Sequence, residues 1–276
     1  MKKWEQYFSA NKDAWNKRTA VHKDSFFYDL EGFKKGKSSL NAIERKDLGD
    51  VSGKKLLHLQ FHFGLDTMSW EREGAIVTGV DISEDAITLA RSVAEETKLN
   101  ARFVCANIYD LANPAIIAAH ESLVEGSFDI VFTSYGTIGW LPDLQQWAAI
   151  IARYLKPGGL FYMADFHPVL WMMDTRFEKI AYDYFNTSVI EEETSGTYTD
   201  RNAPIHYKEY AWNHSFSEII TALLGQQLQL EQFTEYPFSP YNCFNNLEQG
   251  PDGYWRIKDM QERMPMLYVI RARKAA

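Results

Sequence analysis

The sequence predicts an α/β fold in which a mostly parallel sheet carries helices on both faces. From Lys54 onward, short apolar runs alternate with segments whose apolar residues recur at helical spacing. This alternation is typical of βαβ units, which build parallel sheets. The chain of 276 residues is 46% apolar and 14% aromatic, which is enough material for one large core.

The elements follow one another in a regular order. Apolar runs predict strands at residues 54–60, 75–81, 101–107, 128–134 and 160–166. Helical patterns predict helices at residues 66–73, 83–98 and 143–155. Ser83 is a typical N-cap for the second helix. The run Lys156-Pro157-Gly158-Gly159 predicts a tight turn into the fifth strand, because proline disfavours helix and glycine permits positive φ.

The regular alternation of strand and helix patterns ends after Phe166. Residues 167–212 are aromatic and polar, and β-like stretches at 188–200 and 205–212 predict an inserted antiparallel hairpin. A helix is expected at 215–227, where Ser215 and Glu218 match a capping box. Strands are then expected at 230–238 and 265–274.

The N-terminal part of the chain is expected to form a cap. Residues 1–50 show mostly helical patterns, which Gly32 and Gly36 are expected to interrupt. The expected organisation is therefore a cap or lid at 1–50 followed by a domain at 51–276 that carries the insertion at about 167–212.

Composition excludes several classes of partner. The net charge of −8 disfavours a nucleic-acid partner, since such proteins usually present a basic face. Cys105 and Cys243 are the two cysteines, which argues against a disulfide framework. The N-terminus lacks a signal-peptide pattern, and no run approaches 18 apolar residues. We expect a cytoplasmic protein without a membrane partner.

The stretch LLHLQFHFGLDTMSW, residues 56–70, raises the question of a metal site. His58 and His62 have the four-residue spacing of a zinc-binding helix. That spacing brings two imidazoles together only on a helix, whereas His58 lies in a strand pattern and is followed by Leu59. We therefore predict no metal and expect His58 to be a partly buried, hydrogen-bonded sheet residue.

The same stretch has the outline of a nucleotide-binding junction. Gly64 precedes a helix whose first N–H groups should face a crevice at the carboxyl edge of the sheet. Asp81 follows 17 residues later, at the end of the second strand. A carboxylate at that position can accept hydrogen bonds from a ribose diol. The alternative is that Asp81 caps the next helix, although Ser83 can already do so.

Several stretches in order carry a resemblance to a known family. They are LLHLQFHFGLDT, GVDISEDAITLAR, FVCANIYDL, FDIVFTSYGTIGWLPD, LKPGGLFYMADFHPVLW and WNHSFSEIITALL, and together they cover most of residues 54–224. The chain resembles class I S-adenosylmethionine-dependent methyltransferases, and within them a bacterial, small-molecule-type group with a degenerate glycine loop. The stretch HKDSFFYDLEGFKKGKSSL is similar to the lid segment of that group.

The resemblance implies a fold, a cofactor and a set of contacts. The fold is Rossmann-like, with a seven-stranded sheet whose last strand is antiparallel. The cofactor is S-adenosyl-L-methionine, and S-adenosyl-L-homocysteine is its product. The methionine part would be wrapped by Leu59, Gln60, Phe61, His62 and Gly64, of which Gln60 and His62 stand where the family has its first two glycines. Asp81 would hold the ribose, Ile82 and Ile108 would cover the adenine, Asn107 would bind its amino group, and Ser134 and Tyr135 would face the sulfonium end.

The reaction implied is methyl transfer to an oxygen or nitrogen of a small molecule, mainly by proximity and orientation. Candidate bases are His167, Tyr135 and Asp165, with His167 preferred because histidine titrates near neutrality. His167 could equally cap the strand end before Pro168. The acceptor is expected between the cap and the insertion, where the aromatic candidates are Trp15, His22, Tyr28, Trp140, Trp171, Tyr207 and Trp212.

Two other functions remain open from the sequence. The substituted glycine loop is compatible with a non-catalytic protein that binds S-adenosylmethionine or S-adenosylhomocysteine. Asp81 alone also permits a nicotinamide-dependent oxidoreductase. The missing GxGxxG motif and the LKPGG turn count against that second alternative.

Overall fold

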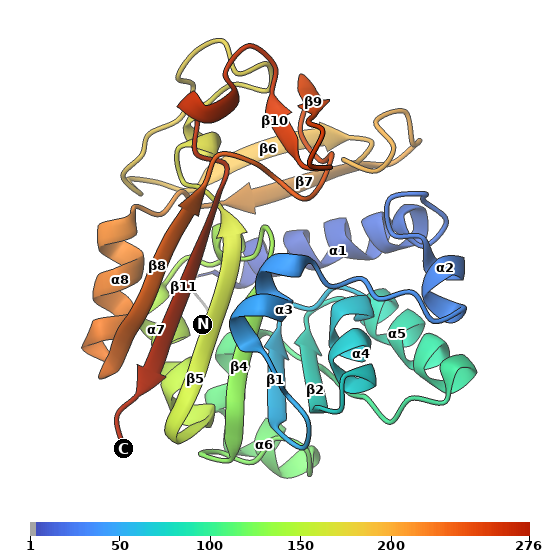
Figure 1. Cartoon of the computed structure of the whole chain (residues 1–276), viewed down its shortest axis with the longest axis vertical. Coiled ribbons are helices and arrows are strands. Elements are labelled where there is room, and N and C mark those ends of the chain that lie inside the picture. The colour runs from blue at the N-terminus through green and yellow to red at the C-terminus, as the bar shows by residue number, and fades with distance from the viewer. Residues whose placement is uncertain (1–3) are drawn as a thin grey trace.

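The computed structural model describes residues 4–276, and a seven-stranded sheet forms its centre (Figure 1). The strand order is β3-β2-β1-β4-β5-β11-β8. The strands are β1 (Lys55–Leu59), β2 (Ile76–Asp81), β3 (Arg102–Cys105), β4 (Phe128–Ser134), β5 (Leu155–Phe166), β8 (Leu228–Tyr236) and β11 (Leu267–Lys274). Strands β1 to β5 pair in parallel, and β11 runs antiparallel to both β5 and β8. The predicted fold class is confirmed.

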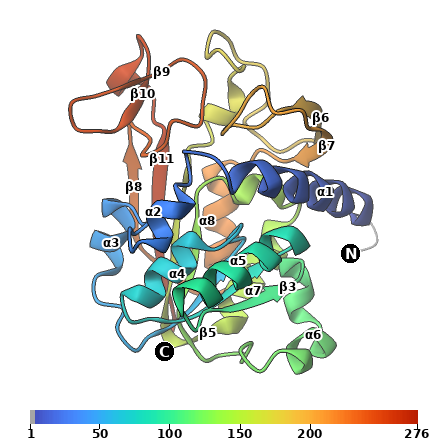
Figure 2. The same ribbon diagram turned by 90° about the vertical axis from the view of Figure 1, so that its right-hand side faces the viewer.

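Helices cover both faces of the sheet (Figures 1 and 2). They are α4 (Leu65–Arg72), α5 (Glu84–Thr97), α6 (Pro114–Ala119), α7 (Leu144–Tyr154) and α8 (Phe216–Gly225). Neighbouring residues of β1 point to opposite faces, as a strand requires. Leu57 joins the core that includes residues of α7 and α8, whereas Leu56 joins a second core with Trp70 of α4. The two buried faces explain why β1 reads as a continuous apolar run.

Capping residues in the sequence predicted most of the helix starts correctly. The Ser83 side chain accepts a hydrogen bond from Ala86 N, and the Ser215 side chain accepts one from Glu218 N. Gly158 has the expected positive φ of 74°. The turn itself differs from expectation, because β5 already begins at Leu155 and the irregularity is taken up as a register shift in its pairing with β4.

The described part of residues 1–50, the expected cap, contains three helices: α1 (Glu5–His22), α2 (Leu30–Lys34) and α3 (Ala42–Leu48). The prediction that Gly32 interrupts a helix is wrong. Gly32 lies inside α2, and its N–H donates to the side chain of Asp29, which caps that helix. Gly36 does follow the helix end, at φ 105°. Residues 1–3 of the expected cap lie outside the described range.

The insertion forms the predicted antiparallel hairpin, with β6 (Ile190–Ser195) paired to β7 (His206–Ala211). A second small ribbon, β9 (Leu247–Gln249) with β10 (Trp255–Ile257), was not predicted. Short 3-10 helices complete the chain: η1 (Ile108–Ala112), η2 (Ile138–Trp140), η3 (Leu170–Met172) and η4 (Gln261–Arg263). Helix α1 packs against β7, and both lie beyond the carboxyl ends of the parallel strands (Figure 1).

None of the helices within residues 4–276 is long and apolar enough to cross a membrane.

Candidate active site

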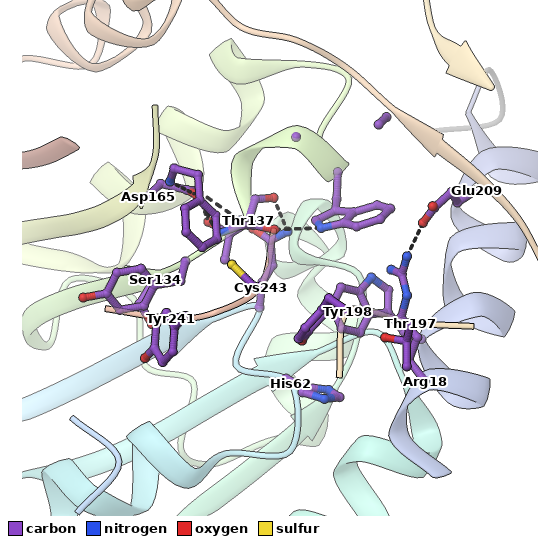
Figure 3. Close-up of a pocket in the computed structure, with 18 of the residues that line it drawn as sticks. Arg18, His62, Ser134, Thr137, Asp165, Thr197, Tyr198, Glu209, Tyr241 and Cys243 are labelled. Carbon is purple, nitrogen blue, oxygen red and sulfur yellow. Dashed lines mark hydrogen bonds and ion pairs between the residues drawn. The ribbon is translucent and has the colours of Figure 1, made fainter. Parts of the chain in front are cut away.

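A cavity of about 1040 Å³ lies at the carboxyl ends of the parallel strands, under α1 and the β6–β7 hairpin (Figure 3). Its size is at the upper end for a small-molecule pocket, so one cofactor and a small second ligand can share it. The predicted contacts that line it are Gln60, Phe61, His62, Gly64, Asp81, Ile82, Asn107, Ile108, Ser134 and Tyr135. The fold therefore brings most of the predicted site together.

The loop after β1 keeps a glycine-like backbone without the glycines. Gln60 and His62 both have φ of 57°, and Gly64 has φ of 81°. This left-handed region is costly for residues with a Cβ. Two hydrogen bonds hold the path: Gln60 Nε2 donates to the Thr137 carbonyl at 2.9 Å, and His62 N donates to Asp81 Oδ2 at 2.8 Å.

Two further predicted contacts, Leu59 at the end of β1 and Phe61 in the loop, are buried and packed. Leu59 is fully buried below the cavity, and its carbonyl accepts a hydrogen bond from Thr133 Oγ1. Phe61 packs against Phe103 and lies so close to Gly79 that a Cβ there would approach its ring to 2.7 Å. Gly79 therefore gives the ring of Phe61 the space it needs under the loop.

Asp81 lies where a ribose-binding acid was expected. Its Oδ1 accepts from Ser83 N at 3.0 Å and its Oδ2 accepts from His62 N. Each carboxylate oxygen can accept more than one hydrogen bond, so both can still receive a ligand hydroxyl. Burial raises the pKa of Asp81 to about 6, although these backbone N–H groups act in the opposite direction.

The adenine side of the predicted site is apolar with one amide. Ile82 follows β2, Ile108 begins η1, and both line the cavity. Asn107 precedes η1 and caps it, because its Oδ1 accepts from Tyr109 N at 3.1 Å.

Ser134 ends β4, Tyr135 follows it, and both line the cavity. Ser134 Oγ lies 3.4 Å from Asp66 Oδ2, and the Tyr135 hydroxyl donates to Glu44 Oε2 at 2.7 Å. Burial raises the pKa of Tyr135 well above its ordinary value. A raised pKa keeps this phenol protonated near neutral pH, which argues against Tyr135 as a general base.

His167, the preferred candidate base, does not line the cavity, although its neighbours Asp165 and Phe166 do. Its Nε2 donates to Glu235 Oε1 at 2.7 Å, its Nδ1 accepts from Val169 N at 3.1 Å, and the residue is 3% exposed. With both ring nitrogens engaged, His167 orders the chain after β5, and the capping alternative is the one that fits.

Asp165, the third candidate base, anchors the turn after β4. Its carboxylate accepts from the backbone N–H groups of Gly136, Thr137 and Ile138, and from the Thr137 hydroxyl. Since these donors fill its acceptor sites, Asp165 has a structural role.

His58 lies in β1 and is hydrogen-bonded to a residue of α4. Its Nδ1 shares a hydrogen bond of 2.8 Å with Thr67 Oγ1, and the residue is 2% exposed. The expected hydrogen-bonded sheet residue is confirmed, and it is more deeply buried than expected. Within the described residues, no group of three or more His, Cys, Asp and Glu side chains is arranged to hold a metal ion.

Sequence reasoning missed the polar residues that roof the cavity. Arg18 of α1 forms a buried ion pair with Glu209 of β7 (Figure 3). The one signal available was spacing, because Trp15, Arg18 and His22 recur at i, i+3 and i+7 on one face of α1. The aromatic candidates that line the cavity are Trp15, Tyr28, Trp140, Trp171, Tyr207 and Trp212. His22 lies behind them and contacts His62.

Part of the sequence is similar to known proteins. A family model described as "Methyltransferase domain" matches residues 57–159. Ubiquinone biosynthesis O-methyltransferase of Coxiella burnetii is 32% identical over 114 residues, which cover 41% of this chain and 44% of that protein. The enzyme of the same name from Pectobacterium atrosepticum is 30% identical over 158 residues, 54% of this chain and 60% of that protein. The chain thus matches about half of the length of these bacterial relatives.

A solved structure extends the likeness to the fold. A putative S-adenosylmethionine-dependent methyltransferase from Listeria monocytogenes superposes with a TM-score of 0.56 at 18% identity, and the superposition covers 84% of this chain and 96% of that one. The loop after β1, strands β2, β3 and β4, and Asp81 at the end of β2 lie within the matched segment of the family model. Residues 57–159 therefore match a methyltransferase domain, and the chain shares the fold of S-adenosylmethionine-dependent methyltransferases.

Proposed function

We propose that this protein transfers a methyl group from S-adenosyl-L-methionine to an oxygen or nitrogen of a small-molecule acceptor. The observation that carries the proposal is the shared cavity, in which the predicted cofactor contacts face a roofed space beyond them. The acceptor would occupy that space.

The residues present fit the cofactor. Asp81 offers carboxylate oxygens for the ribose hydroxyls, and Ile82 and Ile108 offer flat apolar contact for the adenine. At the other end, Asp66 presents a carboxylate that suits the ammonium of the methionine part; burial raises its pKa to about 6, so it is mostly ionised at pH 7. Asn107, Ser134 and the backbone of the loop from Leu59 to Gly64 would supply the remaining contacts.

The chain's own contribution would be to orient the acceptor and exclude water. When bound, S-adenosylmethionine supplies a methyl group already activated by its positive sulfonium. The roof of α1 and β7, tied by Arg18 and Glu209, would shield the reacting groups. Since His167, Tyr135 and Asp165 are engaged elsewhere, alignment of the two reactants would provide most of the rate enhancement.

The organisation proposed with this function has a cap at residues 1–50 and a cofactor-binding domain at 51–276 with its insertion at about 167–212. The protein would act in the cytoplasm on a small acceptor rather than a nucleic acid. The net charge of −8 supports that choice.

Parallel calorimetric titrations with S-adenosylhomocysteine, S-adenosylmethionine and NADH test the proposal. We expect micromolar binding of the first two and no binding of NADH. Binding of NADH alone would sink the proposal in favour of an oxidoreductase. Tight binding of S-adenosylhomocysteine without transfer to a broad panel of phenols, amines and carboxylic acids would favour the non-catalytic alternative, which the substituted positions Gln60 and His62 motivate.

A further inference from the structure

Two of the three guanidinium nitrogens of Arg18 are hydrogen-bonded among the described residues, and the third is not. Its Nε donates to the Tyr207 hydroxyl at 3.0 Å, and its Nη2 donates to Glu209 Oε2. Its Nη1 is buried and has no hydrogen-bond partner within residues 4–276. The residue is 6% exposed and lines the cavity. Leaving buried N–H groups unpaired is costly, so a native structure needs a reason for it.

Aromatic rings fix the position of this free edge. The guanidinium carbon lies 4.8 Å from the ring centroid of Trp15, 5.2 Å from that of Trp140 and 4.7 Å from that of Tyr207. Trp140 is itself held, because its indole N–H donates to the Gly136 carbonyl at 2.8 Å. The rings and the ion pair therefore hold the guanidinium beside an aromatic wall of the cavity (Figure 3).

A second unpaired polar atom lies in the same region. His62 Nδ1 is buried and lacks a partner among the described residues, and its ring lies 5.1 Å from Trp15. Trp15 thus contacts both the Arg18 and the His62 side chains. Two orphaned atoms beside one tryptophan point to a ligand with polar groups in this part of the cavity.

The charge around Arg18 indicates what kind of oxygen it would bind. Glu209 already balances the positive charge, and its second oxygen, Oε1, accepts from Thr194 Oγ1 at 2.8 Å. An anionic ligand would bring a second negative charge close to this buried carboxylate. A neutral oxygen can accept from Nη1 without this cost.

We propose that Arg18 is the acceptor-recognition residue, which donates from Nη1 to a neutral carbonyl or ring-hydroxyl oxygen of a flat, conjugated acceptor packed against Trp15 and Trp140. The inference rests on the proposed function, because it places the acceptor beside the cofactor. It names the substrate class as planar and uncharged at the oxygen that Arg18 holds.

Three small probes of similar size test the proposal: acetophenone, with a neutral carbonyl; benzoate, with an anion; and ethylbenzene, with no oxygen. Each is titrated by saturation-transfer NMR into protein loaded with S-adenosylhomocysteine. We expect acetophenone to bind about tenfold more tightly than either of the others, as one hydrogen bond from a charged donor allows. This preference should disappear in Arg18→Lys, which keeps a positive partner for Glu209 but loses the planar fork.

Arg201→Lys is the matched control, because Arg201 is exposed and also lines the cavity; it should keep the preference. If Arg18→Lys does not fold, the double variant Arg18→Met/Glu209→Gln removes both charges together and should show the same loss.

Equal binding of the three probes, or tightest binding of benzoate, overturns the proposal. So does a tenfold loss of S-adenosylhomocysteine affinity in Arg18→Lys with the acetophenone preference intact, since Arg18 would then hold the cofactor. Failure of the proposed function is distinguishable, because the wild-type protein would then not bind S-adenosylhomocysteine at all.

Discussion

His62 Nε2 lies 2.9 Å from His22 Nδ1, and the two imidazole rings are perpendicular. His22 Nε2 lies in turn 2.6 Å from Thr197 Oγ1. One hydrogen-bonded chain therefore joins the loop after β1, helix α1 and the inserted hairpin segment. Burial lowers the pKa of His22 to about 3 and lowers that of His62 well below its ordinary value, so both rings are neutral at pH 7.

The His22 ring should make the fold sensitive to acid. Below pH 6.5 the unfolded chain gains a proton on His22, whereas the folded chain stays neutral until about pH 3, so stability falls as the pH falls through this window. Between pH 7 and 5 this contribution is about 2 kcal/mol. Urea titrations at pH 7 and pH 5 measure this effect. The free energy of unfolding of the wild type should fall by about 2 kcal/mol more between these pH values than that of His22→Phe.

The exposed His206 provides the control for that experiment. His206→Phe makes the same substitution at an exposed position and is the matched control for the effect of the substitution itself. Identical slopes for His22→Phe and the wild type would mean that His22 is protonated in the folded protein.

Gln60 should tolerate glycine better than a β-branched residue. At φ 57°, glycine removes the backbone strain while losing the hydrogen bond to Thr137, so Gln60→Gly should change stability by less than about 1 kcal/mol. Gln60→Val should cost roughly 1–2 kcal/mol more, because its Cβ branch suits this region poorly. Urea unfolding measures both, and equal stability of the two variants would contradict the left-handed loop.

Asp81 should control how cofactor affinity depends on pH. Its pKa of about 6 means that the carboxylate is protonated as the pH falls from 7 to 5, so S-adenosylhomocysteine should bind progressively more weakly. Asp81→Asn should bind it about 10- to 100-fold more weakly at pH 7, from the loss of charged hydrogen bonds. Calorimetry at pH 7, 6 and 5 measures both effects.

The pKa of Asp66 is also about 6. Asp66 should therefore account for the pH dependence of S-adenosylhomocysteine affinity that remains in Asp81→Asn. The exposed Asp85 in the next helix is the control, and Asp85→Asn should behave as wild type. Unchanged affinity in Asp81→Asn would show that this acid does not hold the ribose.

Glu44 should destabilise the fold as the pH rises. Burial, followed by the charge of Asp66, raises its pKa to about 8. Between pH 4.5 and 8 the unfolded chain loses this proton and the folded chain keeps it, so the contribution opposes folding increasingly across that window. Glu44→Gln should therefore lose less stability than the wild type between pH 5 and 8, by on the order of a few kcal/mol.

Glu248→Gln supplies the comparison, since it makes the same substitution at an exposed position away from Glu44. Parallel profiles for Glu44→Gln and the wild type would indicate that Glu44 is ionised in the folded protein.

The sequence predicted the site best where function depends on the backbone. The loop around Gly64 and the acid Asp81 were recognisable, because a strand, a turn and a helix in succession place their ends at one edge of the sheet. The positions of the candidate bases could not be predicted from local sequence in the same way. His167 lies next to the right strand end, yet its contact with Glu235, 68 residues away, turns it out of the cavity.

By itself, the sequence determined the order of the sheet elements, the inserted hairpin and the cofactor-type loop, since each depends on periodicity or on turn residues close together in the chain. Only the tertiary structure decided what roofs the cavity. The Arg18–Glu209 pair spans 191 residues, and the His22–Thr197 contact spans 175. Neither leaves a local pattern, because a buried polar partner is chosen by the packing of distant elements rather than by neighbours in sequence.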